Sequence, residues 1–136
     1  MLTSFRGLMA VTLATAGLSL ATPAMAQSED SGFTTSANVA LTTDYRFRGV
    51  SLSGGDPAIQ GGFDVAHDSG FYIGTWASSI KGGPSYGDVE LDLYAGWSGS
   101  LSDAVGIDVG VLYYMYPTED LGLDTDYIEP YASISA

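Results

Sequence analysis

The chain has 136 residues, 16 of them acidic and 4 basic, which gives a formal net charge of −12. This balance argues against nucleic-acid binding, which needs clustered lysine and arginine to neutralise phosphates. Cysteine is absent and histidine occurs once, so disulfide frameworks, thiolate or multi-histidine metal centres and cysteine nucleophiles are excluded, and we expect no cofactor and no metal.

Residues 1–26 have the pattern of a secretory signal peptide. Arg6 provides a positive charge, Leu8 to Leu20 is an uncharged apolar run, and Pro23 precedes the small-residue cleavage motif "AMA". We expect cleavage after Ala26, which leaves residues 27–136 as one domain. The alternative is an N-terminal membrane anchor, but the apolar run is short compared with the ~20 residues that span a membrane.

The first predicted strand extends from Phe33 to Arg48. Its odd positions are mainly apolar, and its even positions are polar and then charged, ending in Asp44, Arg46 and Arg48. A strand places these two sets on opposite faces because successive side chains alternate.

Similar alternation predicts further strands near 59–68, 71–80, 88–98, 105–115 and 127–136, and no convincing helix after residue 26. Pro130 in the last strand cannot donate a backbone hydrogen bond to a neighbour. The connecting segments are long at 49–57, short at 67–70, then 81–87, short at 98–103, and long at 117–126. This alternation is typical of a meander of hairpins in an outer-membrane barrel.

The fold class that we predict is all-β: an antiparallel, up-and-down transmembrane β-barrel, here an incomplete meander of about six strands. Barrels of this type begin at about eight strands. The pattern also stops without a closing strand, so we expect a fragment, or a subunit that completes its barrel with other strands.

A soluble β-sandwich also alternates, but its surface usually mixes acidic and basic residues, whereas the basic residues after residue 26 are only Arg46, Arg48 and Lys81. Aromatic residues also lie near strand ends, as in the interfacial girdles of membrane barrels. We expect five of them at the lipid interface: Phe33, Tyr45, Phe47, Trp97 and Tyr113.

Four segments carry a resemblance to a known family: "DYRFRG", "DPAIQGGFD", "HDSGFYIGTW" and "DVELDLYAGW". With them the chain resembles the TorF family of porins, Gram-negative outer-membrane proteins of the Gcw_chp type, from about Ala37 to its end. The resemblance implies a passive channel. Members of that family resemble a complete barrel of roughly twice this length, so this chain resembles their N-terminal half.

The charged faces of the predicted strands provide candidate pore-lining residues: Asp44, Arg46, Arg48, Asp64, Asp88, Glu90, Asp92 and Asp108. Opposed charges across a pore bias its ion selectivity. The alternative is that the arginines only neutralise acids on adjacent strands and hold the register of the sheet.

Three other features favour ordinary structural roles over functional ones. His67 lies beside a turn, where a single histidine is most often solvated. The loop 117–126 carries acids that suit Ca²⁺ or Mg²⁺, but it lacks EF-hand spacing. The carboxylates at 88, 90 and 92 need no catalysis to explain them, so we expect no enzyme.

We therefore expect an outer-membrane porin, exported through a cleaved signal peptide in a Gram-negative bacterium. Its partners would be outer-membrane lipid and the small polar solutes or ions that diffuse through it, with cations preferred, and association into a homo-oligomer is compatible with this function. The alternatives are a structural barrel plugged by its own side chains and, less favoured, a soluble periplasmic β-sandwich that binds a ligand.

Overall fold

The computed structural model describes residues 20–27 and 31–136, with side chains from residue 31 onward. Its elements in chain order are β1 (Leu20–Gln27), β2 (Phe33–Thr42), β3 (Arg46–Phe47), β4 (Val50–Ser51), β5 (Ala58–His67), β6 (Phe71–Ser79), α1 (Gly83–Tyr86), β7 (Val89–Ser102), β8 (Val105–Met115) and β9 (Tyr127–Ser135).

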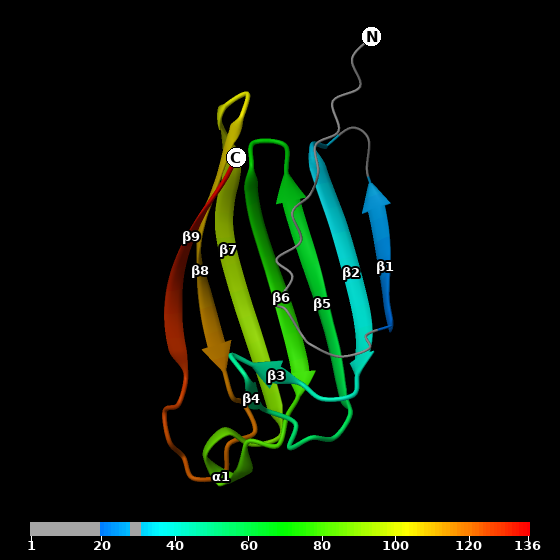
Figure 1. Cartoon of the computed structure of the whole chain (residues 1–136), viewed down its shortest axis with the longest axis vertical. Coiled ribbons are helices and arrows are strands. Elements are labelled where there is room, and N and C mark those ends of the chain that lie inside the picture. The colour runs from blue at the N-terminus through cyan, green and yellow to red at the C-terminus, as the bar shows by residue number, and fades with distance from the viewer. Residues whose placement is uncertain (1–19, 28–30) are drawn as a thin grey trace.

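Seven of the strands form one antiparallel sheet in the order β1-β2-β5-β6-β7-β8-β9 (Figure 1). Every strand pairs with the sheet strand that precedes or follows it in the chain, so the predicted all-β meander is confirmed. Within the described residues this sheet is open, with β1 and β9 as its edges. Pro130 lies in the edge strand β9, where a missing backbone donor is tolerated.

All of strand β1 except Gln27 lies in the segment that we predict to be a signal peptide. It pairs with β2 from Leu20 opposite Leu41 to Gln27 opposite Thr34. Cleavage after Ala26 stays a prediction, and residues 1–19, with Arg6 and most of the apolar run, lie outside the described residues.

The predicted alternation of long and short connections is confirmed, but the predicted connection 98–103 is shorter than expected because β7 continues to Ser102. Three long connections, residues 43–57, 80–88 and 116–126, lie at one end of the sheet, the lower end in Figure 1. The turns 68–70 and 103–104 lie at the other end. The second long connection contains the one-turn helix α1, which sequence periodicity could not reveal, and which has a proline at its start.

Burial is inverted between the two faces of the sheet. The first, which we call the apolar face, carries large side chains that are mostly in contact with solvent, such as Leu41 (58% exposed), Ile59 (59%) and Ile73 (60%). The second, which we call the polar face, carries Gln60, Glu90 and Asp92, of which the two acids are only 2% and 4% exposed. In the described part of the chain, no helix is long and apolar enough to cross a membrane.

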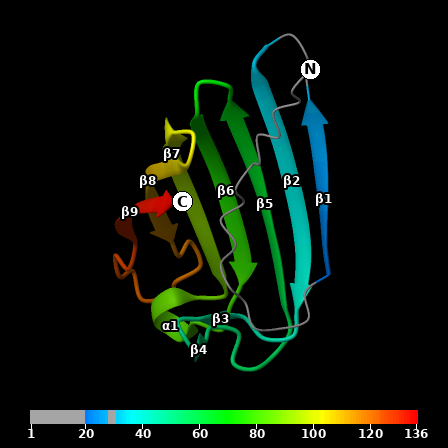
Figure 2. The same cartoon turned by 45° about the horizontal axis from the view of Figure 1, so that its top comes forward.

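The first strand ends at Thr42, so its predicted extension to Arg48 is wrong. The chain instead forms the hairpin β3–β4, in which Arg46 pairs with Ser51 and Phe47 with Val50 (Figure 2). Arg48 and Gly49 have φ angles of 49° and 87°, as a two-residue type I′ turn requires. Alternation could not locate this break because the arms of the hairpin alternate as well.

The buried core is small and lies where the long connections meet the polar face. It consists of Tyr45, Ala58, Ile80, Tyr114 and Tyr116, with Leu52, Trp76 and Leu112 packed against it. Aromatic side chains bury the most area per residue. The core therefore fixes the hairpin and its flanking loop to the sheet.

Candidate functional site

The polar face carries a network in which tyrosine hydroxyls bind carboxylates on other strands. The hydroxyl of Tyr72 on β6 donates to Asp108 Oδ1 of β8 over 2.5 Å and also contacts the hydroxyl of Tyr131 on β9. The hydroxyl of Tyr94 on β7 donates to Asp64 Oδ1 of β5. The bonds to Asp108 and Asp64 each span one intervening strand, and the contact with Tyr131 spans two, so these side chains link non-adjacent strands across the face.

Each of these three tyrosines lies directly opposite a glycine on the adjacent strand. The pairs are Gly74 with Tyr94, Gly96 with Tyr72 and Gly110 with Tyr131. A Cβ atom added at any of the three glycines would lie 2.4 Å from an atom of the opposing tyrosine side chain. Because glycine has no side chain, these positions leave room for the tyrosine rings, which lie over them. Aromatic residues cover glycines in other β-sheets in the same way.

Glu90 and Asp92 are buried side by side on the polar face of β7. Glu90 accepts hydrogen bonds from the hydroxyls of Tyr45, at 2.6 Å, and Tyr116, at 3.2 Å. Asp92 lies in register between Trp76 and Tyr114, and its Oδ1 atom has no hydrogen-bond partner among the described residues. Glu90 is thus satisfied by hydroxyls, whereas Asp92 is a buried acid with an unpaired oxygen.

No basic side chain neutralises this pair. In the part of the chain that the structure describes, the ion pairs are Arg46 with Asp44, Arg48 with Glu129, and Lys81 with Asp56. Buried carboxylates without a cation are costly. The hydroxyls of Tyr45 and Tyr116 therefore stabilise Glu90 in place of a basic side chain.

The base of the β3–β4 hairpin is organised by Asp44. Its Oδ1 accepts from the hydroxyls of Ser51 at 2.5 Å and Ser53 at 3.0 Å, and its Oδ2 accepts from Arg46 Nε at 2.6 Å. These donors, that of Ser51 foremost, hold the pKa of Asp44 below its ordinary value. The ionised carboxylate is thus the form that holds the hairpin together.

The hairpin and its approach lie against the polar face through ring contacts and an ion pair, in addition to the hydrogen bond from Tyr45 to Glu90. The ring of Tyr45 meets Trp76 edge-on at 5.5 Å, and the ring of Phe47 meets Tyr114 at 6.4 Å. Arg48 Nη2 lies 3.0 Å from Glu129 Oε1 on β9. Burial, reinforced by the hydrogen bond to Glu90, raises the pKa of Tyr45 well above its ordinary value, so its phenol stays a donor.

The structure divides the predicted pore-lining residues into three groups. Asp64, Glu90, Asp92 and Asp108 share the polar face. Asp44, Arg46 and Arg48 belong to the hairpin and its approach, so their predicted place on the wall of the first strand is wrong. Asp88 precedes β7 in an exposed connection, where its backbone N–H donates to Thr118 Oγ1 at 2.8 Å.

The five aromatic residues predicted at a lipid interface also divide. Phe33, Trp97 and Tyr113 lie on the apolar face, the first two near the short turns and Tyr113 near the long connections. Tyr45 and Phe47 turn to the polar side, and Tyr45 is buried, so the expectation for these two is wrong. The hairpin reverses the chain before either ring could take up the apolar face.

Arg48 and Phe47 contact each other although they are neighbours in the sequence. The guanidinium carbon of Arg48 lies 4.9 Å from the centre of the Phe47 ring. On a regular strand, neighbouring side chains point to opposite faces. The contact arises because Arg48 occupies the turn.

His67 and the acidic loop have structural partners. His67 Nδ1 lies 2.7 Å from Ser69 Oγ, and its ring packs on Phe33 at 4.6 Å. In the loop, Glu119 accepts from the backbone of Leu123, and Asp126 from that of Tyr116. Among residues 20–27 and 31–136, no group of three His, Cys, Asp or Glu side chains is arranged to hold a metal ion.

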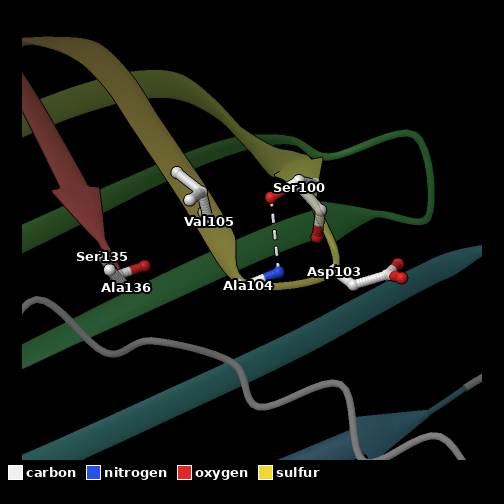
Figure 3. A pocket seen from close by; sticks show the side chains of 8 residues that line it. Ser100, Asp103, Ala104, Val105, Ser135 and Ala136 are labelled. Carbon is white, nitrogen blue, oxygen red and sulfur yellow. Dashed lines mark hydrogen bonds between the residues drawn. The ribbon is translucent and has the colours of Figure 1, made fainter.

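An open pocket lies at the short-turn end of the sheet, between the β7–β8 turn and the last residues of β9 (Figure 3). It is lined mainly by small side chains, with Asp103 as its charged residue. The backbone N–H of Ala104 donates to Ser102 Oγ at 3.3 Å and so closes the turn. The pocket offers no set of convergent reactive groups, so the polar face with its hairpin is the candidate site.

Sequence analysis did not identify Tyr72, Tyr94, Tyr131 and Glu129 as part of this site. The signal that could have identified the tyrosines is a glycine directly opposite each of them on the neighbouring strand, because such a glycine leaves room for a ring. Using that signal requires the register, which the sequence alone does not provide.

The fold and the site define an all-β protein whose antiparallel sheet exposes apolar side chains on one face and holds acids and tyrosines on the other. The chain belongs to the Gcw_chp family, described as bacterial protein of unknown function, whose family model matches residues 26–136. No curated protein and no solved structure matches the chain.

Proposed function

We propose that the chain forms part of an outer-membrane β-barrel of a Gram-negative bacterium through which small polar solutes or ions diffuse passively. The apolar face would contact lipid and the polar face would line the interior. Further strands would close the sheet at its open edges, because lipid leaves no partner for unpaired backbone groups. The resemblance of the four quoted segments to TorF porins supports the same function.

The inverted burial of the sheet is the observation that carries this proposal. A soluble sheet buries its apolar face against another layer, yet here Leu41, Ile59 and Ile73 are exposed while Glu90 and Asp92 are buried. Between Phe33 and Leu41 a strand rises about 27 Å at roughly 3.4 Å per residue. That length, shortened somewhat by strand tilt, matches the apolar band of about 25 Å in membrane barrels.

The charges of the polar face favour cations over anions. Asp64 and Asp108 share this face, and Glu129 joins them from β9. Acids along a pore attract cations and repel anions. We therefore expect a cation-preferring channel, with the arginines of the hairpin opposing that preference locally.

A second candidate function is a barrel that conducts nothing because its interior is filled. The observation that favours it is the cluster of Tyr45, Tyr114 and Tyr116, which packs the space between the hairpin and the sheet. Such a barrel would act as a structural or adhesive component of the membrane.

Two measurements test the proposal. After membranes are washed with carbonate and urea, the protein should remain in the membrane fraction and require detergent for release; release by osmotic shock would overturn the membrane assignment. In planar bilayers under a KCl gradient, the purified protein should conduct with a cation-selective reversal potential. Stable insertion without conductance would favour the filled barrel instead.

A further inference from the structure

A row of four rings crosses the apolar face at the short-turn end of the sheet. Phe33 on β2 lies opposite His67 on β5, and Phe71 on β6 lies opposite Trp97 on β7. The tight turn 68–70 joins β5 to β6 and places His67 beside Phe71. In the proposed barrel this row would lie where the apolar band meets water on the side of the short turns.

A second open groove, of about 210 Å³, lies over this row. Its surface is almost entirely apolar, and its lining consists of Phe33, Val65, His67, Phe71, Tyr72 and Ile73. Pockets that take up a whole drug-sized molecule have volumes of about 300–1,000 Å³. The smaller groove therefore suits a segment of a hydrocarbon chain that continues along the sheet.

His67 brings a hydrogen-bond donor to the edge of this groove. The backbone N–H of Ser69 donates to His67 Nδ1 at 3.1 Å, so Nδ1 is an acceptor and the neutral ring carries its hydrogen on Nε2. Among the described residues, Nε2 has no hydrogen-bond partner. The Nε1–H of Trp97, in contrast, donates to the carbonyl of Ser69 at 2.9 Å. The turn thus fixes the histidine ring and leaves its Nε2–H for a ligand.

The charge beside this donor is negative. A Cβ atom added at Gly32 would lie 3.2 Å from His67 Nε2 and 3.6 Å from Asp68 Oδ2, so the donor and the carboxylate lie close together. The lysine and arginine residues that the structure describes all lie in the long connections, at the other end of the sheet. A phosphate that binds His67 therefore meets Asp68 with no base to offset it, unless the ligand also carries an ammonium group that donates to Asp68.

We propose that this groove binds a phospholipid with an ethanolamine headgroup. One acyl chain lies along Phe33, Phe71 and Ile73. The phosphate accepts from the Nε2–H of His67, and the primary ammonium group donates to Asp68. The proposal rests on the membrane location given under the proposed function and names a lipid partner for the apolar face, and it does not require that the barrel conducts.

Quenching of Trp97 fluorescence by brominated lipids tests this proposal. The complete protein is reconstituted into phosphatidylcholine vesicles that contain a fixed fraction of brominated phosphatidylethanolamine, phosphatidylcholine or phosphatidylglycerol. Trp97 belongs to the row of rings, whereas Trp76, the other tryptophan, lies on the polar face against Tyr45 and should give a constant background. The relative binding constant should be roughly two- to fivefold higher for phosphatidylethanolamine, the factor expected from one exposed charge contact.

Two variants separate the contacts of the headgroup. Asp68→Asn should remove the preference for ethanolamine over choline, because it removes the charge that pairs with the ammonium group. His67→Phe keeps a ring in the row but removes the donor, so it should weaken the binding of both lipids roughly two- to tenfold, as the loss of one hydrogen bond does. Asp103→Asn is the matched control, since it removes an acid from the other short turn and should change neither value.

The outcomes distinguish this proposal from the function on which it rests. Equal quenching by the three lipids, an ethanolamine preference that survives Asp68→Asn, or unchanged binding by His67→Phe would overturn the lipid site alone. Protein that does not float with the vesicles would overturn the membrane location and the lipid site with it.

Discussion

The hydroxyl of Tyr45 donates a 2.6 Å hydrogen bond to Glu90 and joins residues 45 positions apart in the chain. Both side chains are almost fully buried, at 1% and 2% exposure. This contact attaches the hairpin to the polar face. The connection that follows β2 is therefore part of the candidate site.

Tyr45→Phe should lower the free energy of unfolding by about 1–3 kcal/mol, because it leaves a buried carboxylate short of a donor. The hairpin should also become cleavable by protease near Arg46 and Arg48. Urea unfolding in detergent and timed trypsin digestion measure the two effects. Tyr86→Phe, at a half-exposed tyrosine of α1, is the control and should change neither.

Replacing Asp92 or Glu90, the two buried acids of β7, by its amide should change the stability of the protein in opposite directions. Asp92→Asn should raise the free energy of unfolding, measured in urea, by roughly 1–3 kcal/mol, since it removes a buried acid whose oxygen lacks a partner. Glu90→Gln should lower it, because it weakens the acceptor of two tyrosine hydroxyls. A lower free energy of unfolding for Asp92→Asn would instead show that the Asp92 carboxylate makes a stabilising contact.

Gly74→Ala should destabilise the sheet by about 1–3 kcal/mol, because the new Cβ would lie 2.4 Å from Tyr94. A double-mutant cycle isolates the cause. In a Tyr94→Ala background the same substitution should cost little. An equal cost in both backgrounds would mean that the ring is not what requires the glycine.

Charged substitutions at adjacent positions of β2 distinguish the two faces. Val39→Arg places a charge on the apolar face, and Asn38→Arg places the same charge on the polar face. If the apolar face contacts lipid, Val39→Arg should cost about 2–4 kcal/mol of stability near the midplane, and Asn38→Arg much less. Heat-dependent gel mobility after refolding into lipid vesicles measures both variants, and equal tolerance would contradict lipid contact.

Acid should loosen the hairpin. The pKa of Asp44 is lowered in the folded protein, so its stabilising effect is fully present above the ordinary value of 3.8 and is lost as the pH falls through the lowered pKa. Pepsin should therefore cleave residues 43–57 increasingly fast below that pH. Asp44→Asn should be cleaved at a rate that changes less with pH, and a wild-type rate that follows only the activity of pepsin would contradict this role.

Much of the sheet was predictable because period-two alternation is a local property. Phe63 and Asp64, or Leu91 and Asp92, are assigned to opposite faces by their order alone, and the strands and alternating connections follow from the same pattern. The resemblance to the Gcw_chp type is also confirmed, although the porin name stays a proposal.

The hairpin and the tyrosine network were not predictable in this way. Thr42 does not differ from its neighbours in any local property that ends a strand, and the turn at Arg48 lacks the usual asparagine. The inward position of Tyr45 depends on Glu90, which is remote in the sequence. Likewise, Tyr94 reaches Asp64 only through a register that a linear pattern does not contain.

The pairing of each sheet strand with its chain neighbour has an evolutionary consequence. No strand depends on a distant segment for its backbone partners, so a hairpin can be duplicated or deleted without disturbing the register of the others. The length of such a protein can therefore change in units of two strands. The β3–β4 hairpin belongs to a single connection and would be inherited unchanged, so the number of strands in the sheet and the chemistry of the site can evolve separately.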